Sequence, residues 1–331
     1  CDDAFVVASE PYGLVELTDR YLRMDGESPS NPDDPTGSRG QIIELESELA
    51  GTLEGIRRRS YDGSELPVAA DELTHAEITT RDIDRGDYPH FLLKEITESP
   101  VSFRKTLRGR LGTDPNGRLR AVVGDETLPP GLRTRLADGA IDEILVIGQG
   151  TAAIAGRAAA AAIEELLGDR EITVRSLPAT ELSGFQLEND MSNVLVVAIS
   201  QSGTTTDTNR TVDLVRARGA GVVAIVNRRG SDLVDKADGV LYTADGRDVE
   251  MSVASTKAFY SQVAAGFILA DAIAGEVGVD DGDHRHSLLT ALSQMPAAME
   301  ATLARRPEIA EAARQFAPAR RYWAIVGNGP N

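Results

Sequence analysis

The chain has 331 residues and a formal net charge of −18. This charge excludes the basic surface that nucleic acids and anionic membranes require, although a local cluster of hydrogen-bond donors can still bind a phosphorylated ligand. The single cysteine excludes an internal disulfide and leaves too few thiolates for a structural zinc site. No apolar run reaches the ~20 residues of a membrane span. We therefore predict a soluble, cytoplasmic protein, and we expect neither a metal site nor a cofactor.

The first 86 residues are weakly patterned. Residues 2–27 indicate a strand at 5–8, a short helix beginning near residue 9 and a second strand ending near residue 25. The segment SPSNPDDPTGSRG at 28–40 has the composition of a linker. Apolar side chains in 41–60 recur at helical spacing and predict a helix, at Ile42, Ile43, Leu45, Leu49, Leu53 and Ile56. A further helix is predicted from residue 88, interrupted at Pro100.

The middle of the chain predicts an α/β fold. Apolar runs within 141–148, 171–178, 193–200, 220–227 and 238–244 alternate with helical patterns. Strands that are apolar on both faces are typical of a parallel sheet covered by helices on each side. We predict a doubly wound parallel sheet flanked by helices, followed by a helical connector over 284–320 and a new strand within 321–331.

Hydroxyl side chains are concentrated in the segment AISQSGTTTDTNR at 198–210, directly behind the apolar run 194–197. Parallel sheets bind ligands at the carboxyl ends of their strands, and the N-terminus of the following helix attracts anions. Gly203 would let the backbone approach a ligand, and the hydroxyls of Ser200, Ser202, Thr204 and Thr205 could bind phosphate oxygens. The competing interpretation is an ordinary helix N-cap, which needs only one hydroxyl.

Two other turns are polar. Residues 148–153, GQGTAA, match the G-x-G-x-x-A pattern of dinucleotide-binding turns, but the following strand ends in serine and proline instead of an acidic residue. The alternative is a tight turn that lines its neighbour's pocket. The segment MSVASTKAF at 251–259 is a third polar helix entrance. Together the three turns would suit a phosphorylated polyol, although they could also be three unrelated caps.

The sequence resembles the family of isomerising glutamine–fructose-6-phosphate aminotransferases, whose sugar domains are SIS domains. Residues 200–208, SQSGTTTDT, are similar to the family's Ser-Gln-Ser-Gly-Glu-Thr-x-Asp-Thr, and 253–259, VASTKAF, match Val-Ala-Ser-Thr-Lys-Ala-Phe. Residues 88–96, YPHFLLKEI, resemble the helix that leads into the isomerase half. Residues 5–27 resemble the last part of the N-terminal glutaminase domain.

The resemblance implies a domain order. We expect the end of a glutaminase-type domain at 1–27, a linker at 28–86 and a helical lead-in at 87–120. A first SIS domain would occupy 121–283, followed by the connector at 284–320 and the first strand of a second SIS domain at 321–331. The chain would then be an internal fragment. The family's nucleophilic cysteine would not be Cys1, and its Schiff-base lysine and acid–base glutamate would lie beyond residue 331, so we assign no catalytic residue.

The resemblance also implies a ligand and its contacts. The full-length protein would convert fructose 6-phosphate and glutamine to glucosamine 6-phosphate and glutamate, as a homodimer assembled through SIS domains. The phosphorylated hexose would be bound by a set of turn residues, namely Thr151, Ser200, Gln201, Ser202, Gly203, Thr205, Val253, Ala254 and Ser255.

Two departures from the family pattern concern the substrate. Ala152 stands where the family's Cys-Gly-Thr-Ser has serine, and Thr204 stands where it has glutamate. They indicate a divergent subfamily. Two other functions remain open: a non-catalytic sugar-phosphate sensor that uses the same pocket, and a nucleotide-binding domain of Rossmann type.

Overall fold

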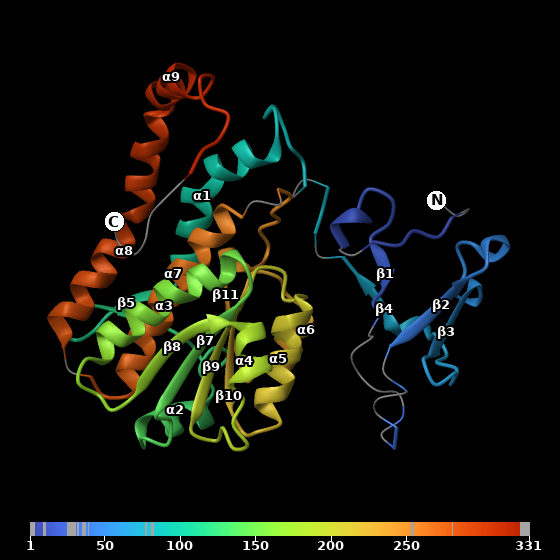
Figure 1. Ribbon diagram of the computed structural model, residues 1–331, viewed down its shortest axis with the longest axis horizontal. Coiled ribbons are helices and arrows are strands. Elements are labelled where there is room, and N and C mark those ends of the chain that lie inside the picture. Colours follow the sequence, from blue (N-terminus) through green and yellow to red (C-terminus); the bar gives the residue numbers. More distant parts are fainter. Residues whose placement is uncertain are drawn as a thin grey trace. The chain divides into compact units, whose positions relative to one another are not determined.

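The computed structural model describes residues 4–8, 11–24, 31, 33–34, 38, 40–76, 78–80, 83–252, 255–279 and 281–324. The chain divides into two compact units, Cys1–Gly86 and Asp87–Asn331 (Figure 1).

The described part of the first unit contains two antiparallel strand pairs joined by short 3-10 turns. Strand β1 (Arg20–Leu22) pairs with β4 (Leu73–His75), and β2 (Gln41–Leu45) pairs with β3 (Ile56–Ser60). The 3-10 turns are η1 (Pro11–Gly13), η2 (Ser47–Leu49), η3 (Leu53–Gly55) and η4 (Ala70–Glu72). The strand predicted at 5–8 is absent, because these residues have no hydrogen-bonded strand partner in the described part of the chain.

The helix predicted over 41–60 is wrong. Residues 41–45 and 56–60 instead form the antiparallel hairpin of β2 and β3, and ion pairs across it favour that structure. Arg59 forms an ion pair with Glu44 at 2.6 Å, and Arg57 forms one with Glu46 at 3.2 Å. The β-branched Ile42 and Ile43 also favour a strand over a helix.

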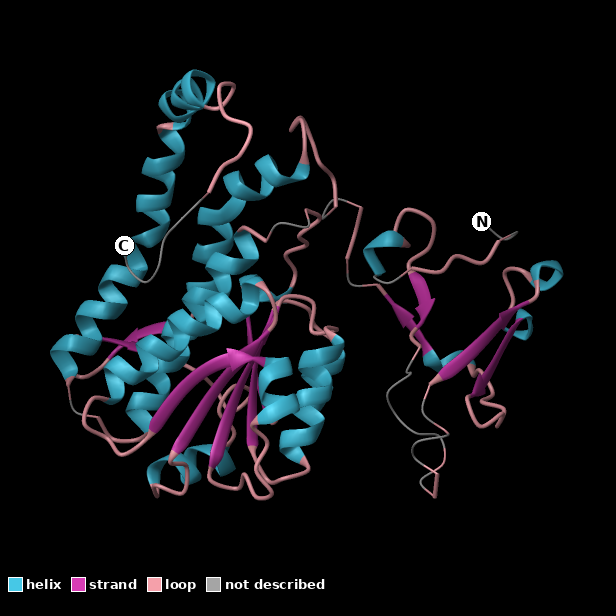
Figure 2. Ribbon diagram, in the orientation of Figure 1, coloured by secondary structure: helices cyan, strands magenta, loops and turns pink. Residues whose placement is uncertain are grey.

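The second unit is built on a parallel five-stranded sheet with the order β11-β10-β9-β7-β8 (Figure 2). Its strands are β7 (Glu143–Gly148), β8 (Thr173–Pro178), β9 (Val194–Ser200), β10 (Gly221–Val226) and β11 (Gly239–Tyr242). The chain moves outward from β7 to β8 and then returns to place β9 on the other side of β7. This confirms the predicted doubly wound α/β fold, and it puts the switch in strand order between β7 and β9.

Helices cover both faces of this sheet. Alternate strand residues point to opposite sides, so Ile144 and Val146 of β7 join one core while Leu145 and Ile147 join the other. The first core contains side chains from α1 (Phe91–Leu107), α2 (Pro130–Ala137), α3 (Thr151–Leu167), α7 (Lys257–Glu276) and α8 (Gly282–Ala304). The second contains side chains from α4 (Ala179–Phe185), α5 (Thr206–Arg216) and α6 (Asp232–Lys236).

The segments flanking the sheet differ in part from the predictions. Helix α1 continues through Pro100 without the predicted interruption. The antiparallel pair β5 (Leu111–Thr113) and β6 (Leu119–Ala121) follows it, within the lead-in predicted as helical. Beyond α8 come α9 (Arg306–Phe316) and residues 321–324, which form no strand. The rest of the strand predicted within 321–331 lies outside the described residues.

Helix α7 is apolar along most of its length. By length and composition alone it could cross a membrane, which corrects the expectation that no segment of the chain is long and apolar enough. However, 72% of its most apolar window is buried inside the unit. Packing against α1, α3 and the sheet accounts for its composition.

Candidate functional site

The turn between β9 and α5 is closed by hydrogen bonds within itself. The backbone N–H of Gly203 donates to Ser200 Oγ at 3.0 Å. Ser202 Oγ accepts hydrogen bonds from the backbone N–H of Thr204 at 3.2 Å and from its hydroxyl at 2.9 Å. These bonds hold the turn in one conformation and place its hydroxyls at the carboxyl end of β9.

The glycine in this turn is required by both conformation and space. Gly203 has φ +69°, and a Cβ at this position would lie 2.0 Å from Ser231 Oγ. The buried side chain of Asn209, one turn into α5, donates to the carbonyl oxygens of Gly203 at 3.0 Å and Thr205 at 3.1 Å. The turn is therefore ordered before any ligand arrives.

A cavity of about 250 Å³ opens beside this turn, at the switch point between β7 and β9. Six of the predicted site residues line it: Thr151, Ser200, Gln201, Ser202, Thr205 and Ser255. Gly203 shapes the turn but is not among the lining residues, and Val253 and Ala254 lie outside the described residues. The other lining residues are Gln149, Ala152, Ile199, Glu250, Ser252 and Gln262.

The turn after β7 contributes to the same cavity. Gln149 donates from its amide nitrogen to Asp207 Oδ2 at 3.2 Å and to Thr180 Oγ1 at 3.3 Å, which joins this turn to α4 and α5. Gly148 allows the close approach of α3, because a Cβ there would lie 2.9 Å from the backbone of Ala152. Gln149, Thr151 and Ala152 of the G-x-G-x-x-A segment thus line the cavity beside the hydroxyl-rich turn.

Glu250 organises the polar entrance of α7 and was not predicted. Its carboxylate accepts hydrogen bonds from the backbone N–H of Thr256 at 2.7 Å and of Ala258 at 3.3 Å, and from Ser255 Oγ at 3.0 Å. A carboxylate at a helix N-terminus is stabilised by the unpaired N–H groups there. In the sequence, the only sign of this role is that an acidic residue lies shortly before a helix start rich in serine and threonine.

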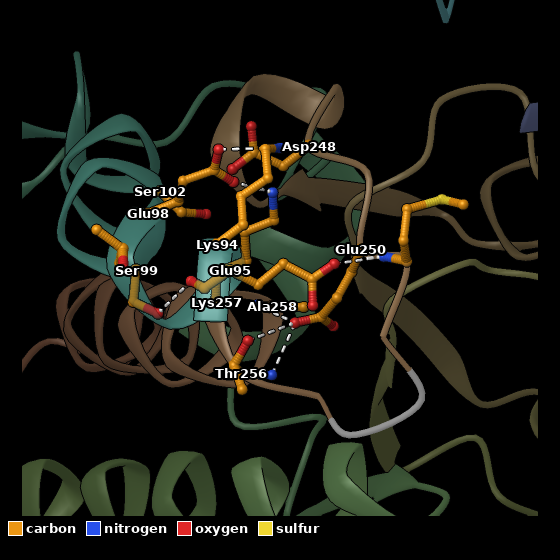
Figure 3. A network of polar contacts seen from close by, with 12 residues as sticks. Lys94, Glu95, Glu98, Ser99, Ser102, Asp248, Glu250, Thr256, Lys257 and Ala258 are labelled. Carbon is orange, nitrogen blue, oxygen red and sulfur yellow. Dashed lines mark hydrogen bonds and ion pairs between the residues drawn. The ribbon is translucent and has the colours of Figure 1, made fainter. Parts of the chain in front are cut away.

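Helix α1 holds this segment from the other side (Figure 3). Glu95 is 1% exposed, and its carboxylate accepts hydrogen bonds from the backbone N–H of Met251 at 2.5 Å and of Ser252 at 3.1 Å, and from the Ser252 hydroxyl. Because Ser252 and its neighbour Glu250 both line the cavity, Glu95 positions one wall of the pocket without lining it. In the sequence, Glu95 lies in a segment that resembles a helix of the family, and nothing in the sequence indicates its role.

An ion pair joins α1 directly to α7. Lys257 Nζ lies 2.8 Å from Glu98 Oε2, and Lys94 Nζ lies 3.0 Å from Glu98 Oε1. Burial raises the pKa of Glu98, but the hydrogen bonds and charges of the two lysines outweigh burial, so the pKa lies below its ordinary value.

The lining residues indicate what the cavity can do. Hydroxyls and amides predominate, no lining residue is basic, and Glu250 is the one ionisable group among them. Hydroxyl and backbone donors suit the oxygens of a phosphate, and mixed donors and acceptors suit a chain of hydroxyl groups. The lining residues therefore supply groups that a polar, phosphorylated ligand can use.

The chain is similar in sequence to known proteins. A SIS domain matches residues 141–272. The glutamine–fructose-6-phosphate aminotransferase [isomerizing] of Corynebacterium efficiens is 36% identical over 240 residues, covering 72% of this chain and 36% of that protein. The Bacillus spizizenii protein of the same name is 31% identical over 325 residues, covering 98% of this chain and 47% of that protein. The chain thus spans less than half the length of these curated relatives.

Solved structures show the same fold. The C-terminal domain of glucosamine-fructose-6-phosphate aminotransferase from Francisella tularensis superposes with a TM-score of 0.58 and 26% identity, covering 70% of this chain and 61% of that one. A protein from Clostridium difficile 630, named as a candidate phosphosugar isomerase, superposes with a TM-score of 0.52 at 19% identity, covering 68% of this chain and 57% of that one. Residues 141–272 thus match a SIS domain, and the chain is similar in sequence to isomerising glutamine–fructose-6-phosphate aminotransferases.

Proposed function

We propose that the cavity binds a phosphorylated hexose, with its phosphate against the turn formed by residues 200–205. The carbon chain would extend toward Thr151 and toward the segment from Val253 to Ser255. The proposal rests on one observation above all: a pre-ordered turn of hydroxyl groups lies at the switch point of the sheet, beside a polar cavity.

The helix-cap alternative explains this turn less well. Thr205 is the N-cap residue of α5, yet its side chain makes no capping hydrogen bond to the helix. Its hydroxyl instead lies 3.4 Å from Ser200 Oγ, on the wall of the cavity. A hydroxyl that faced the helix would serve as a cap, whereas one that faces the cavity can contact a ligand.

We further propose that the full-length protein is an isomerising glutamine–fructose-6-phosphate transaminase. It would convert fructose 6-phosphate and glutamine to glucosamine 6-phosphate and glutamate and would assemble as a homodimer through its SIS domains. The named relatives support this activity. Within the described residues the cavity supplies binding, and we assign it no catalytic residue.

Isothermal titration calorimetry of the chain with fructose 6-phosphate, unphosphorylated fructose and inorganic phosphate tests the binding proposal. We expect fructose 6-phosphate to bind more tightly than phosphate, and fructose not to bind measurably. Equal affinity for fructose and fructose 6-phosphate would contradict a phosphate site. An assay of the complete protein for glucosamine 6-phosphate then tests the activity, since binding without turnover would favour a sensor.

A further inference from the structure

Gln262, in the second turn of α7, is a buried polar side chain. It is 2% exposed, and its Oε1 atom has no hydrogen-bond partner among the described residues. A buried amide oxygen left unpaired is destabilising, and natural proteins keep few of them. Such a group requires an explanation in terms of what occupies the space beside it.

The other buried polar side chains of α7 do have partners. Lys257 contacts Glu98, and Ser261 Oγ lies 2.9 Å from Ser102 Oγ. Asp271 pairs with Arg285 at 2.7 Å. Gln262 is the exception on this helix, and it lines the cavity. The missing partner is therefore expected to be a group that enters the cavity.

The position of Gln262 is fixed by packing on two sides. The contact between Ser261 and Ser102 holds the adjacent residue against α1. One turn later Gly266 packs so closely on α3 that a Cβ there would lie 2.6 Å from the Cβ of Ala159. The amide is thus presented from a rigid part of the helix, as a pre-organised ligand contact requires.

Two other residues that line the cavity, Ala152 and Glu250, offer a ligand little hydrogen bonding. Ala152, which also lines the cavity, presents a methyl group and can neither donate nor accept a hydrogen bond. The carboxylate of Glu250 is already committed to the N-terminus of α7. Gln262 offers both an acceptor and donors, the combination that a sugar hydroxyl can use fully.

We infer that Gln262 is a specificity-determining residue whose side-chain amide hydrogen-bonds a hydroxyl on the carbon chain of the phosphorylated sugar. This inference rests on the proposed function, because it assumes that a phosphosugar occupies the cavity. It assigns Gln262 to recognition of the polyol part of the ligand and leaves the phosphate to the turn at 200–205.

The test compares affinities for fructose 6-phosphate and inorganic phosphate in the wild-type chain and in Gln262→Met, which keeps the length of the side chain and removes its hydrogen bonding. We expect Gln262→Met to weaken fructose 6-phosphate binding about tenfold and to leave phosphate binding unchanged. Its melting temperature without ligand should equal or exceed that of the wild type, because an unpaired polar group has been replaced by an apolar one. Gln294→Met, at an exposed position on α8, is the matched control and should alter neither quantity.

Ser261→Ala separates a structural effect from a ligand effect, because it leaves Ser102 unpaired and should lower the melting temperature without a selective loss of sugar binding. Unchanged fructose 6-phosphate affinity in Gln262→Met would overturn the inference. Equal weakening of both ligands, or a fall in melting temperature like that of Ser261→Ala, would also overturn it by assigning Gln262 a structural role. Failure of the wild-type chain to bind either ligand would instead reject the proposed function itself, and the inference with it.

Discussion

The carboxylate of Glu95 in α1 accepts a hydrogen bond at 3.1 Å from the backbone N–H of Ser252, a residue 157 positions later in the chain. Helix α1 precedes the sheet in the chain. Through this contact it positions one wall of the cavity. The contact is buried and charge-assisted, which makes it stronger than a bond between neutral groups.

Glu95→Gln should loosen this wall. The amide can accept only through its single oxygen, so the hydrogen bonds from Met251 and Ser252 can no longer all be satisfied. We expect a loss of about 1–3 kcal/mol in unfolding free energy, measured by urea denaturation. Fructose 6-phosphate affinity should fall more than phosphate affinity, because the turn at 200–205 is untouched. Glu164→Gln, exposed on α3, is the control, and a Glu95→Gln chain that behaves like it would refute the positioning role.

Gly203→Ala should damage the phosphate turn. The left-handed conformation costs an alanine about 1–2 kcal/mol, and the new Cβ would collide with Ser231. Gly230→Ala is a matched control, because Gly230 also has positive φ (+60°) but has nothing within 4 Å of the added Cβ. We expect both variants to lose stability in thermal melts and only Gly203→Ala to lose phosphosugar binding. Equal binding by the two variants would show that the geometry of the turn does not matter for the ligand.

The hydroxyls of Ser202 and Thr205 should each contribute to binding. Removing either hydroxyl would leave a polar ligand group without a partner, and we expect Ser202→Ala and Thr205→Ala each to weaken fructose 6-phosphate binding by about 1–3 kcal/mol, measured by calorimetry. Ser293→Ala, exposed on α8, is the control and should bind as the wild type does. Wild-type affinity in both turn variants would remove the turn from the site.

The ion pairs of Glu98 predict a dependence of stability on pH. Because the pKa of Glu98 is lowered in the folded state, its contribution is fully present above its ordinary value of 4.5 and is lost as the pH falls through the lower, folded-state pKa. Glu98→Gln should cost up to about 1 kcal/mol at pH 7, since the pair is partly exposed, and little at pH 3. Urea midpoints of both chains at the two pH values provide the measurement. A constant difference between the two chains would contradict this account.

The sheet was predictable because its signal is local. The central strands β7, β9 and β10 are short apolar runs bounded by glycines and polar turns, and this pattern suffices to predict a buried parallel strand. The hydroxyl-rich turn was also predictable, because all its members lie within six residues of Ser200.

The rest depended on partners that are distant in the chain. The hairpin of β2 and β3 is favoured by the ion pair between Arg59 and Glu44, diagonal neighbours on the two strands, and an analysis of helical periodicity cannot detect such a contact. The part played by Glu95 depends on Ser252, and the unpaired state of Gln262 depends on how α1, α3 and α7 pack. Such residues lack a sequence signature because their chemistry arises only when separate elements meet.

A thermal-shift titration of the chain with fructose 6-phosphate, glucosamine 6-phosphate, fructose and NAD(P) tests the central claim most directly. A ligand at 100 times its Kd stabilises the folded state by about 2.7 kcal/mol, which raises the melting temperature by several degrees. We predict a rise with the two phosphorylated sugars and none with fructose or NAD(P). A rise with NAD(P) and none with the sugars would contradict the account and make the turn at 148–153 a dinucleotide site.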